Sequence, residues 1–408
     1  MTDTEKPMRE INYDESLVTP FTLPDALVLN DGTPVDSAEM WREHRRPELL
    51  KLFSEHVYGV SPGAPEDISF RVFEESSSVL GGMATRRQVR VTVRNAGRSH
   101  GFDLLIYLPN AAPRPVPVFL GLNFYGNHTI APDPAIRITD SWVRENASFA
   151  TLNHQSTEAS RGANAHCWPV TRILERGYGL ATIYYGDIDP DFDDGFENGV
   201  HPLFDGGQRT DTHWGAIGAW AWSLSRAVDY FETDDDIDAG RVAVMGHSRL
   251  GKTALWAGAQ DERFALTISS GSGCGGAKIF RRNFGETIEH LNRAFPHWFC
   301  RSFNAYTNNE DALPVDQHEL IALVAPRAVY VTSAVEDKWA DPRGEFIAAK
   351  SAEPVYRLLG AGGCDADELP EPLTPVQSII GYHIRYGSHD VLPYDWERWM
   401  DAADRFVR

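Results

Sequence analysis

The chain is poor in basic residues, in cysteine and in long apolar runs. Its 408 residues include 38 lysines and arginines against 58 aspartates and glutamates, which gives a net charge of −20. An acidic surface of this kind argues against binding to nucleic acid or to anionic membranes. No apolar run has the length that a membrane-spanning helix needs, so we also expect no membrane segment.

Cysteine is scarce, and its four copies lie far apart: Cys167, Cys274, Cys300 and Cys364. Their spacing matches no zinc-binding pattern, so we expect no metal site and four scattered, buried thiols. A disulfide between Cys274 and Cys300 stays open at this point.

Signals for export and for separate modules are absent as well. Residues 1–6 are polar and lack the apolar core of a secretory signal. Either the protein works inside the cell, or the given chain starts after a signal that was removed or replaced, so the compartment stays open. Repeats and Ser/Gly-rich linkers are also missing, which favours one domain over residues 1–408, with an irregular arm at 1–35.

The material for a large core is present, and its pattern predicts an α/β fold. Apolar residues make up 42% of the chain and aromatic residues 11%. Alternating runs early in the chain predict antiparallel strands, whereas later apolar runs alternate with amphipathic helices, as in a parallel sheet covered on both faces. A long polar insertion at 125–168 has the character of a substrate-site loop. The expected strands are 68–72, 88–93, 101–108, 116–124, 179–185, 242–245, 265–270, 328–333 and 379–385, and the expected helices are 37–58, 169–176, 214–231, 253–259, 342–351 and 393–406.

One stretch, residues 242–254, has the layout of a nucleophile elbow: a short apolar strand, a tight turn and the start of a helix. Such a turn lifts a serine, here Ser248, above the carboxyl edge of a parallel sheet. The usual pattern is G-x-S-x-G. Gly246 fits it, but Leu250 stands in place of the second glycine, and Gly251 follows one residue late. A serine that merely caps the helix is the alternative interpretation.

A nucleophilic serine needs a base and an acid that orients the base. His389 is the best base, because it follows the last expected strand, where an α/β-hydrolase carries its histidine. His247, next to the serine, should point away from it. The acid should follow the preceding strand, where Glu336 and Asp337 are candidates, while Asp341 precedes a proline and fits a helix cap. All three carboxylates could instead be loop caps.

Five short motifs stand in order along the second half of the chain. They are Gly246-His247-Ser248-Arg249-Leu250-Gly251-Lys252, Ser272-Gly273-Cys274-Gly275-Gly276-Ala277, Phe295-Pro296-His297-Trp298-Phe299-Cys300, Trp339-Ala340-Asp341-Pro342-Arg343-Gly344-Glu345-Phe346 and Gly381-Tyr382-His383-Ile384-Arg385. Together they resemble the glucuronoyl esterases of carbohydrate esterase family 15, and most closely the bacterial branch, from about residue 12 to the end. The resemblance implies an α/β-hydrolase fold: a three-layer sandwich whose mostly parallel central sheet has antiparallel N-terminal strands and long loop insertions.

The resemblance implies that the protein cleaves the ester between a lignin alcohol and the (4-O-methyl-)glucuronic acid of xylan. Ser248 would be the nucleophile and His389 the base, in a two-step acyl transfer. Arg249 would stabilise the oxyanion through its backbone N–H and its guanidinium. No metal and no organic cofactor is implied, and we expect a monomer that acts on glucuronoxylan or a lignin–carbohydrate fragment.

Three further residues match positions that hold the sugar in this family. Lys252 and Glu286 would bind hydroxyl groups, and Trp339 would lie against the pyranose ring. Lys252 comes one helical turn after the serine, so its ammonium can point into the same site. A helix-surface lysine, a solvated glutamate and a core tryptophan are the plainer interpretations.

The chain departs from the family pattern at Gly271. Many members carry their acid there, at the end of the strand after the elbow helix, and glycine has no side chain to offer. The acid must then come from the next strand, with Asp337 as first choice and Glu336 as alternative. The gap keeps open a weakly active carbohydrate-binding homologue, beside the other alternative of a different carbohydrate esterase such as an acetyl xylan esterase.

Overall fold

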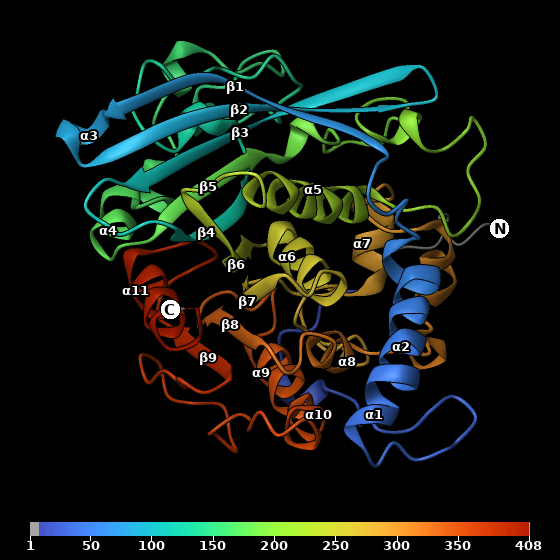
Figure 1. Cartoon of the computed structure of the whole chain (residues 1–408). Coiled ribbons are helices and arrows are strands. Elements are labelled where there is room, and N and C mark those ends of the chain that lie inside the picture. The colour runs from blue at the N-terminus through green and yellow to red at the C-terminus, as the bar shows by residue number, and fades with distance from the viewer. Residues whose placement is uncertain (1–7, 408) are drawn as a thin grey trace.

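A mixed nine-stranded sheet runs through the computed structural model, which describes residues 8–407. The strand order is β1-β2-β3-β5-β4-β6-β7-β8-β9 (Figure 1). The strands are β1 (Asp67–Ser78), β2 (Ala84–Asn95), β3 (Arg98–Pro109), β4 (Val116–Asn123), β5 (Gly179–Tyr184), β6 (Ile237–His247), β7 (Phe264–Ser270), β8 (Ala328–Ala334) and β9 (Ile380–Arg385). The predicted α/β-hydrolase sandwich is therefore confirmed.

The three N-terminal strands are antiparallel, as expected, but much longer than the predicted runs. β1, β2 and β3 have 12 residues each, and their pairing extends from Asp67↔Arg94 to Asn95↔Arg98. Most of the extra residues are polar, and several of them, such as Thr85 and Arg86, are nevertheless buried, so the apolar pattern did not include them. β3 then pairs antiparallel with β5, which joins this ribbon to the parallel part.

The remaining strands pair parallel from β5 to β9. Every residue of β4, β5, β8 and β9 is buried, so β4 and β5 appear in the sequence as mainly apolar runs, whereas β9 also buries His383 and Arg385. Because all these strands point the same way, the loops that follow them meet at one edge of the sheet. This carboxyl edge carries the candidate site.

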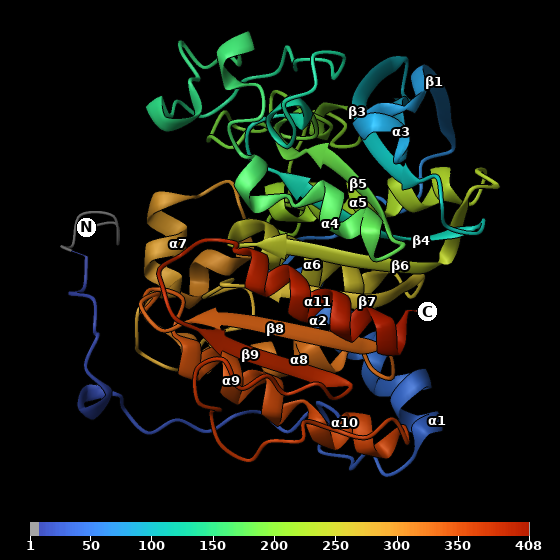
Figure 2. The ribbon, with the colours of Figure 1, turned by 90° about the vertical axis from the view of Figure 1, so that its left-hand side faces the viewer.

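Helices cover both faces of the sheet. The helices are α1 (Ala38–Met40), α2 (Arg46–Phe53), α3 (Val79–Gly82), α4 (Val170–Glu175), α5 (Ala216–Phe231), α6 (Arg249–Gln260), α7 (Ile288–Ala294), α8 (Gln317–Ala322), α9 (Pro342–Ser351), α10 (Glu353–Leu358) and α11 (Pro393–Phe406). α4 and α11 lie on one face, in front of the strands in Figure 2, and α5, α6, α8 and α9 lie on the other. The short helices α3, α7, α8 and α10 were not predicted.

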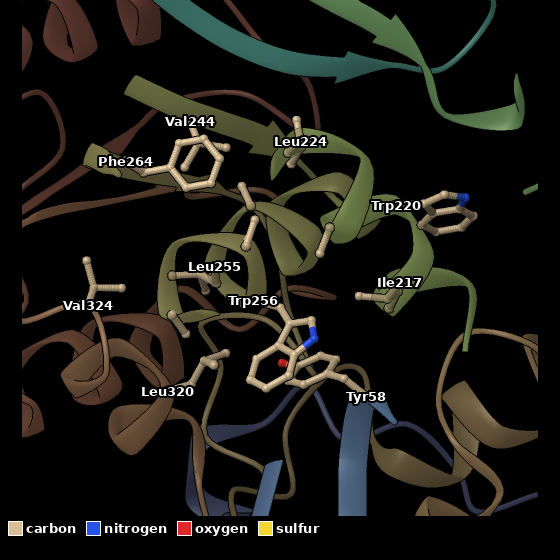
Figure 3. Packing of buried hydrophobic residues seen from close by; sticks show 14 of the residues in the cluster. Tyr58, Ile217, Trp220, Leu224, Val244, Leu255, Trp256, Phe264, Leu320 and Val324 are labelled. Carbon is tan, nitrogen blue, oxygen red and sulfur yellow. The ribbon is translucent and has the colours of Figure 1, made fainter. Parts of the chain in front are cut away.

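The larger core lies between the sheet and the α5–α6 layer. Figure 3 shows Trp256 of α6 facing Tyr58, and their rings stack at 4.6 Å with an interplanar angle of 20°. Both side chains are fully buried. The Tyr58 hydroxyl donates to the Gly275 carbonyl at 3.0 Å, so this core also supports the loop after β7. The contact between Trp256 and Tyr58 thus holds α6, the helix that directly follows the elbow, in place.

The predicted helix at 37–58 is present as a continuous run in which two π-helical turns, Trp41–Arg45 and Ser54–Tyr58, flank α2. Ser37 caps it, because its hydroxyl accepts from the Met40 N–H at 3.2 Å. The run ends at Gly59, whose φ is +88°.

The N-terminal arm and the insertion both reach the carboxyl edge, on the left in Figure 2. Residues 1–7 of the predicted arm lie outside the described part of the chain, and the rest is irregular apart from one turn at Glu15–Leu17. The arm is fastened to the loop before α7, since the Asn12 carbonyl accepts from the Gly285 N–H at 2.9 Å. In the insertion, the Arg161 guanidinium donates to the carbonyls of Asp133 and Ile136 at 2.7 and 2.8 Å.

All four cysteines are free thiols, so the disulfide that the sequence left open is not formed. Cys274, Cys300 and Cys364 are buried, and Cys167 is only partly buried. Between residues 8 and 407, no helix combines the length and the apolar character that crossing a bilayer requires.

Candidate active site

Ser248 stands at the tip of a sharp turn between β6 and α6. Its backbone has φ +58° and ψ −131°, a strained conformation for a residue with a side chain. The turn is held on both sides, because the Ser248 N–H donates to the Ser270 carbonyl and its carbonyl accepts from the Gly251 N–H, each at 2.8 Å. This is the geometry of a nucleophile elbow.

The shifted glycine of the elbow has a packing reason. A Cβ on Gly246 would lie 1.9 Å from the Leu250 carbonyl oxygen, so no side chain fits there. A Cβ on Gly251 would lie 2.9 Å from Cβ of Ser272. Leu250 itself is 1% exposed and packs into the large core. The close approach that usually demands glycine two residues after the serine therefore occurs one residue later.

His389 and Asp337 meet at the carboxyl edge. His389 follows β9, and its Nδ1 lies 2.6 Å from Asp337 Oδ2, in the loop after β8. The Asp337 side chain is 4% exposed and the His389 side chain 39%. Glu336 is exposed and reaches this loop only through its backbone N–H, which donates to the Gly387 carbonyl at 3.1 Å. The structure brings Asp337, not Glu336, to the histidine.

Gly271, the residue directly after β7, lies right beside this pair. Its φ is +49°, and a Cβ built on it would lie 3.2 Å from Asp337 Oδ2 and 3.4 Å from His389 Nδ1. A side chain at residue 271 would thus enter the space that the Asp337 carboxylate now occupies. A carboxylate on residue 271 and the carboxylate of Asp337 would therefore occupy the same position beside His389.

His247 lies against His389, with ring centroids 4.4 Å apart. Its Nδ1 is 3.2 Å from the Ser270 hydroxyl. Loss of water contact, together with His389 and Arg385 nearby, holds the pKa of His247 well below its usual value. His247 is therefore a neutral imidazole that packs beside the candidate base.

The Arg249 guanidinium is held by a carboxylate that the sequence did not single out. Asp191, in the acidic loop after β5, forms an ion pair with Arg249 and also accepts from His297 Nε2 at 3.0 Å and from Trp298 Nε1 at 2.8 Å. Burial raises the pKa of Asp191, but Arg249 and His297 lower it by more. The pKa of this carboxyl therefore lies far below its usual range. The guanidinium carbon also lies 4.7 Å from the Trp298 ring centroid.

Lys252 and Glu286 form a buried pair one turn along α6. The Lys252 ammonium is 2.8 Å from Glu286 Oε2 and donates to the Cys274 carbonyl at 2.5 Å. The two side chains are 3% and 6% exposed. The alternatives of a helix-surface lysine and a solvated glutamate are therefore wrong. A Cβ on Gly273 would lie 2.8 Å from Glu286 Oε2, so this glycine makes room for the pair.

Trp339 is partly exposed, so it is not a core tryptophan. Its ring packs edge-to-face on His290 with centroids 5.1 Å apart. Its carbonyl accepts from the Glu286 N–H at 2.9 Å. The aromatic ring and the charged pair are thus fixed relative to each other.

Two buried groups that the sequence did not reveal support these loops. Glu345 of α9 accepts from the N–H groups of Ser272 and Gly273 at 2.7 and 3.0 Å and from the Ser333 hydroxyl at 2.6 Å. Burial raises its pKa to about 8. Ser272 and Gly273 lie in the loop after β7 and Ser333 lies in β8, so the contacts themselves were not predictable from the sequence; the place of Glu345 in the fourth motif was the available signal.

Arg385, the last residue of β9, fixes the loop that carries His389. Its guanidinium donates to Asp395 at 2.9 Å and to the carbonyls of Tyr386 and Ser388 at 3.0 and 3.3 Å. Its place in the last of the five motifs was the available signal. Asp341, expected as a helix cap, is one, since its side chain accepts from the Gly344 N–H.

A cavity of about 170 Å³ opens beside His389 on the side of the insertion. Its lining is mainly apolar and aromatic. Tyr125 and Phe149 stack there at 4.1 Å with an interplanar angle of 21°, and Trp168 is almost fully buried in the wall. The insertion at 125–168 therefore shapes one side of the site.

Comparison with known proteins gives consistent matches. The family of fungal glucuronyl esterases matches residues 203–360. A solved structure of a promiscuous CE15 esterase from a marine bacterial metagenome superposes with a TM-score of 0.92 at 52% identity, covering 97% of this chain and 100% of that one. A glucuronoyl esterase from Solibacter usitatus gives a TM-score of 0.90 at 46% identity, covering 96% and 99%. A 4-O-methyl-glucuronoyl methylesterase of Wolfiporia cocos is 35% identical over 357 residues, 83% of this chain and 72% of that protein.

Proposed function

Because the chain belongs to the glucuronoyl esterases of carbohydrate esterase family 15, we propose that it hydrolyses esters of (4-O-methyl-)glucuronic acid through Ser248. The observation that carries the proposal is the 2.6 Å contact of Asp337 with His389 at the edge where the elbow presents the serine. Because Asp337 supplies the acid that Gly271 cannot, the alternative of a homologue with a decayed site is also weakened.

The proposed reaction is a two-step acyl transfer. His389 accepts the Ser248 proton as the oxygen attacks the uronate carbonyl carbon, and Asp337 stabilises the imidazolium that forms. The alcohol leaves with the proton from His389. Water then attacks the acyl-enzyme, again with His389 as base, and releases the free uronic acid. This chemistry needs neither a metal nor an organic cofactor.

Arg249 is the proposed oxyanion donor. Its N–H stands at the first position of α6, where a helix leaves backbone donors without a partner in the helix. The Asp191, His297 and Trp298 contacts hold its guanidinium in place before the substrate arrives. A preorganised donor of this kind stabilises the transition state by about 3–4 kcal/mol.

The sugar acid is proposed to lie against Trp339, with its hydroxyl groups on Lys252 and Glu286. A charged pair that is already buried can offer both a donor and an acceptor to a hydroxyl without a new desolvation cost. An acetyl ester has no ring for these groups to hold. The aromatic cavity at Tyr125, Phe149 and Trp168 suits a flat aryl alcohol, which supports a position of the lignin side of the ester beside His389.

The test compares a benzyl ester of glucuronic acid with an acetyl ester of similar reactivity. We expect kcat/KM to favour the glucuronate ester by at least about 100-fold, because buried polar groups discriminate strongly against a substrate that leaves them unpaired. Ser248→Ala should abolish both reactions. Equal turnover of the two esters in the wild-type protein would refute the sugar-acid specificity.

A matched variant separates sugar binding from support of the fold. Glu286→Gln keeps the size of the side chain but removes its charge. It should lower kcat/KM for the glucuronate ester and leave acetyl ester turnover nearly as it was. An equal loss on both substrates would mean that Glu286 acts only as structural support.

A further inference from the structure

A second group of reactive side chains lies on the wall of the cavity beside His389. His166 and Cys167 end the insertion, in the turn Ala165–Cys167, and Asp390 directly follows His389. Cys167 Sγ lies 3.2 Å from His166 Nε2 and 3.4 Å from Asp390 Oδ1. The distance between His166 Nε2 and Asp390 Oδ1 is 3.8 Å. These three residues form the one such cluster in the described chain whose ligand atoms could surround a metal ion.

The three distances fit the edges of a metal tetrahedron. Bond lengths of about 2.0–2.3 Å from zinc to nitrogen, oxygen and sulfur put neighbouring ligand atoms about 3.4–3.6 Å apart. The cluster needs only shifts of a few tenths of an ångström to reach that geometry. Hydrogen bonding alone would account for the short contacts of the thiol, but it does not require the imidazole and the carboxylate to converge on the same sulfur.

The backbone around the cluster is already fixed. The Cys167 carbonyl accepts from Trp396 Nε1 at 2.8 Å, and Asp390 Oδ1 accepts from the Val391 N–H at 2.8 Å. Arg385 donates to the Asp390 carbonyl. Tethers of this kind orient ligands before an ion binds and are typical of the surroundings of metal sites.

We propose that His166 Nε2, Cys167 Sγ and Asp390 Oδ1 bind one borderline-soft divalent ion of the Zn²⁺ type, with water as fourth ligand on the cavity side. A thiolate and an imidazole select zinc or cobalt over magnesium and calcium, which prefer oxygen ligands. The thiol proton passes to solvent as the sulfur–metal bond forms. The thiolate and the carboxylate then neutralise the dication.

Such an ion controls the esterase, and this consequence rests on the proposed function. Asp390 is the neighbour of the candidate base, and His389 lines the same cavity as the three ligands. An ion with its bound water occupies part of the space proposed for the alcohol and restrains the loop of His389. We therefore expect Zn²⁺ to inhibit the hydrolysis of aryl glucuronate esters reversibly.

Binding is tested first with Co²⁺ as a spectroscopic probe, on the full chain and without thiol reductants. One equivalent should give a thiolate-to-cobalt charge-transfer band in the wild-type protein. Cys167→Ser should lack the band, and Cys364→Ser, which removes a different thiol, should keep it. His166→Asn should weaken Zn²⁺ binding at least about tenfold. A band that survives in Cys167→Ser, or its absence from the wild-type protein, would overturn the proposal.

Inhibition is measured separately, as the ratio of initial rates without and with Zn²⁺ for each protein. The ratio should be several-fold for the wild-type protein and for Cys364→Ser, close to one for Cys167→Ser, and reversed by a chelator. If Co²⁺ binds as described but Zn²⁺ leaves the rate unchanged, the regulatory consequence is wrong while the site stands. If no glucuronate ester is hydrolysed at all, the proposed function fails, and the cobalt result still decides the site.

Discussion

At the scale of single residues, the least expected feature is a residue without a side chain. Gly271 directly follows β7, at a place where a Cβ would lie close to both Asp337 and His389. Two strand ends can therefore supply an acid to the same imidazole nitrogen. This explains how a chain that lacks a carboxylate in one position can hold the histidine with another.

Moving the acid tests this equivalence. Asp337→Ala should lower kcat by about 10³–10⁴-fold, since the base loses its orienting partner while the oxyanion donors remain. Adding Gly271→Asp to that variant should raise kcat again by at least about tenfold, because a carboxylate on residue 271 reaches His389 Nδ1. Aspartate also tolerates the positive φ of this position better than most residues do. The matched control is Gly271→Asn in the same background, which fills the space without a charge. A folded double variant no faster than Asp337→Ala would contradict the equivalence.

Glu345 gives the fold a pH dependence whose sign is fixed by its burial. Burial raises the pKa of Glu345 from an ordinary value of 4.5 to about 8. Between these values the folded protein keeps a proton that the unfolded chain releases, so this contribution to stability is present below pH 4.5 and is lost as the pH rises through 8. Glu345→Gln imitates the protonated form and avoids the loss.

Thermal unfolding at pH 5, 6.5 and 8 measures the effect. The melting temperature of Glu345→Gln relative to wild type should rise by at least about 3 °C from pH 5 to pH 8. Glu336→Gln, which changes an exposed carboxylate in the loop near Asp337, should show no such trend. A difference that does not vary with pH would mean that Glu345 titrates normally.

At the scale of elements, the elbow shows how packing changes a motif. Leu250 is buried against the large core, and the glycine that the tight turn needs stands at residue 251. Leu250→Gly would give the usual elbow sequence. We expect it to lower the free energy of unfolding by about 3–5 kcal/mol, because a core side chain is lost and a helix gains glycine.

Urea denaturation measures this change, with Leu250→Met as the control. Methionine conserves the volume and should cost less than about 1.5 kcal/mol. Equal stability of the two variants would show that Leu250 contributes little to the core and that the shifted glycine has another cause.

The sequence predicted the regular elements well and the short ones poorly. Strands buried on both faces and the long helices α5 and α11 leave clear apolar patterns. The helices α7, α8 and α10 have six or seven residues, too few turns for a periodicity to appear. The predicted helix at 253–259 in fact starts at Arg249. Ser248 is the residue before the first helical turn, so the helix follows the serine directly.

The candidate site was predictable where chain order determines position. Ser248, His389 and Asp337 follow three different strands, and the carboxyl ends of parallel strands meet at one edge, so their order sufficed. Asp191 was not predictable, because its contacts with Arg249 and His297 join residues 58 and 106 positions apart. Such a contact exists only once the loops are placed in space.

At the scale of the whole molecule, the net charge of −20 opposes an acidic polymer substrate. Xylan fragments that carry free glucuronate groups are repelled, whereas a small neutral ester is not. Salt screens charges beyond about 10 Å at 0.1 M. Raising KCl from 20 to 200 mM should therefore raise kcat/KM on glucuronoxylan fragments by about threefold.

The same salt series on a neutral benzyl glucuronate ester provides the control and should leave kcat/KM nearly constant. Initial rates at substrate concentrations below KM measure both. A fall in kcat/KM on the polymer with added salt would mean that a local basic surface attracts it despite the overall charge.

Positions 271 and 337 both face the same histidine, and this bears on how such proteins change over generations. The two positions compete for the same space beside the base, so a lineage exchanges one carboxylate for the other instead of carrying both. The acid is thus the part of this machinery that can drift between positions, while the serine and the histidine, each with a single place in the fold, cannot.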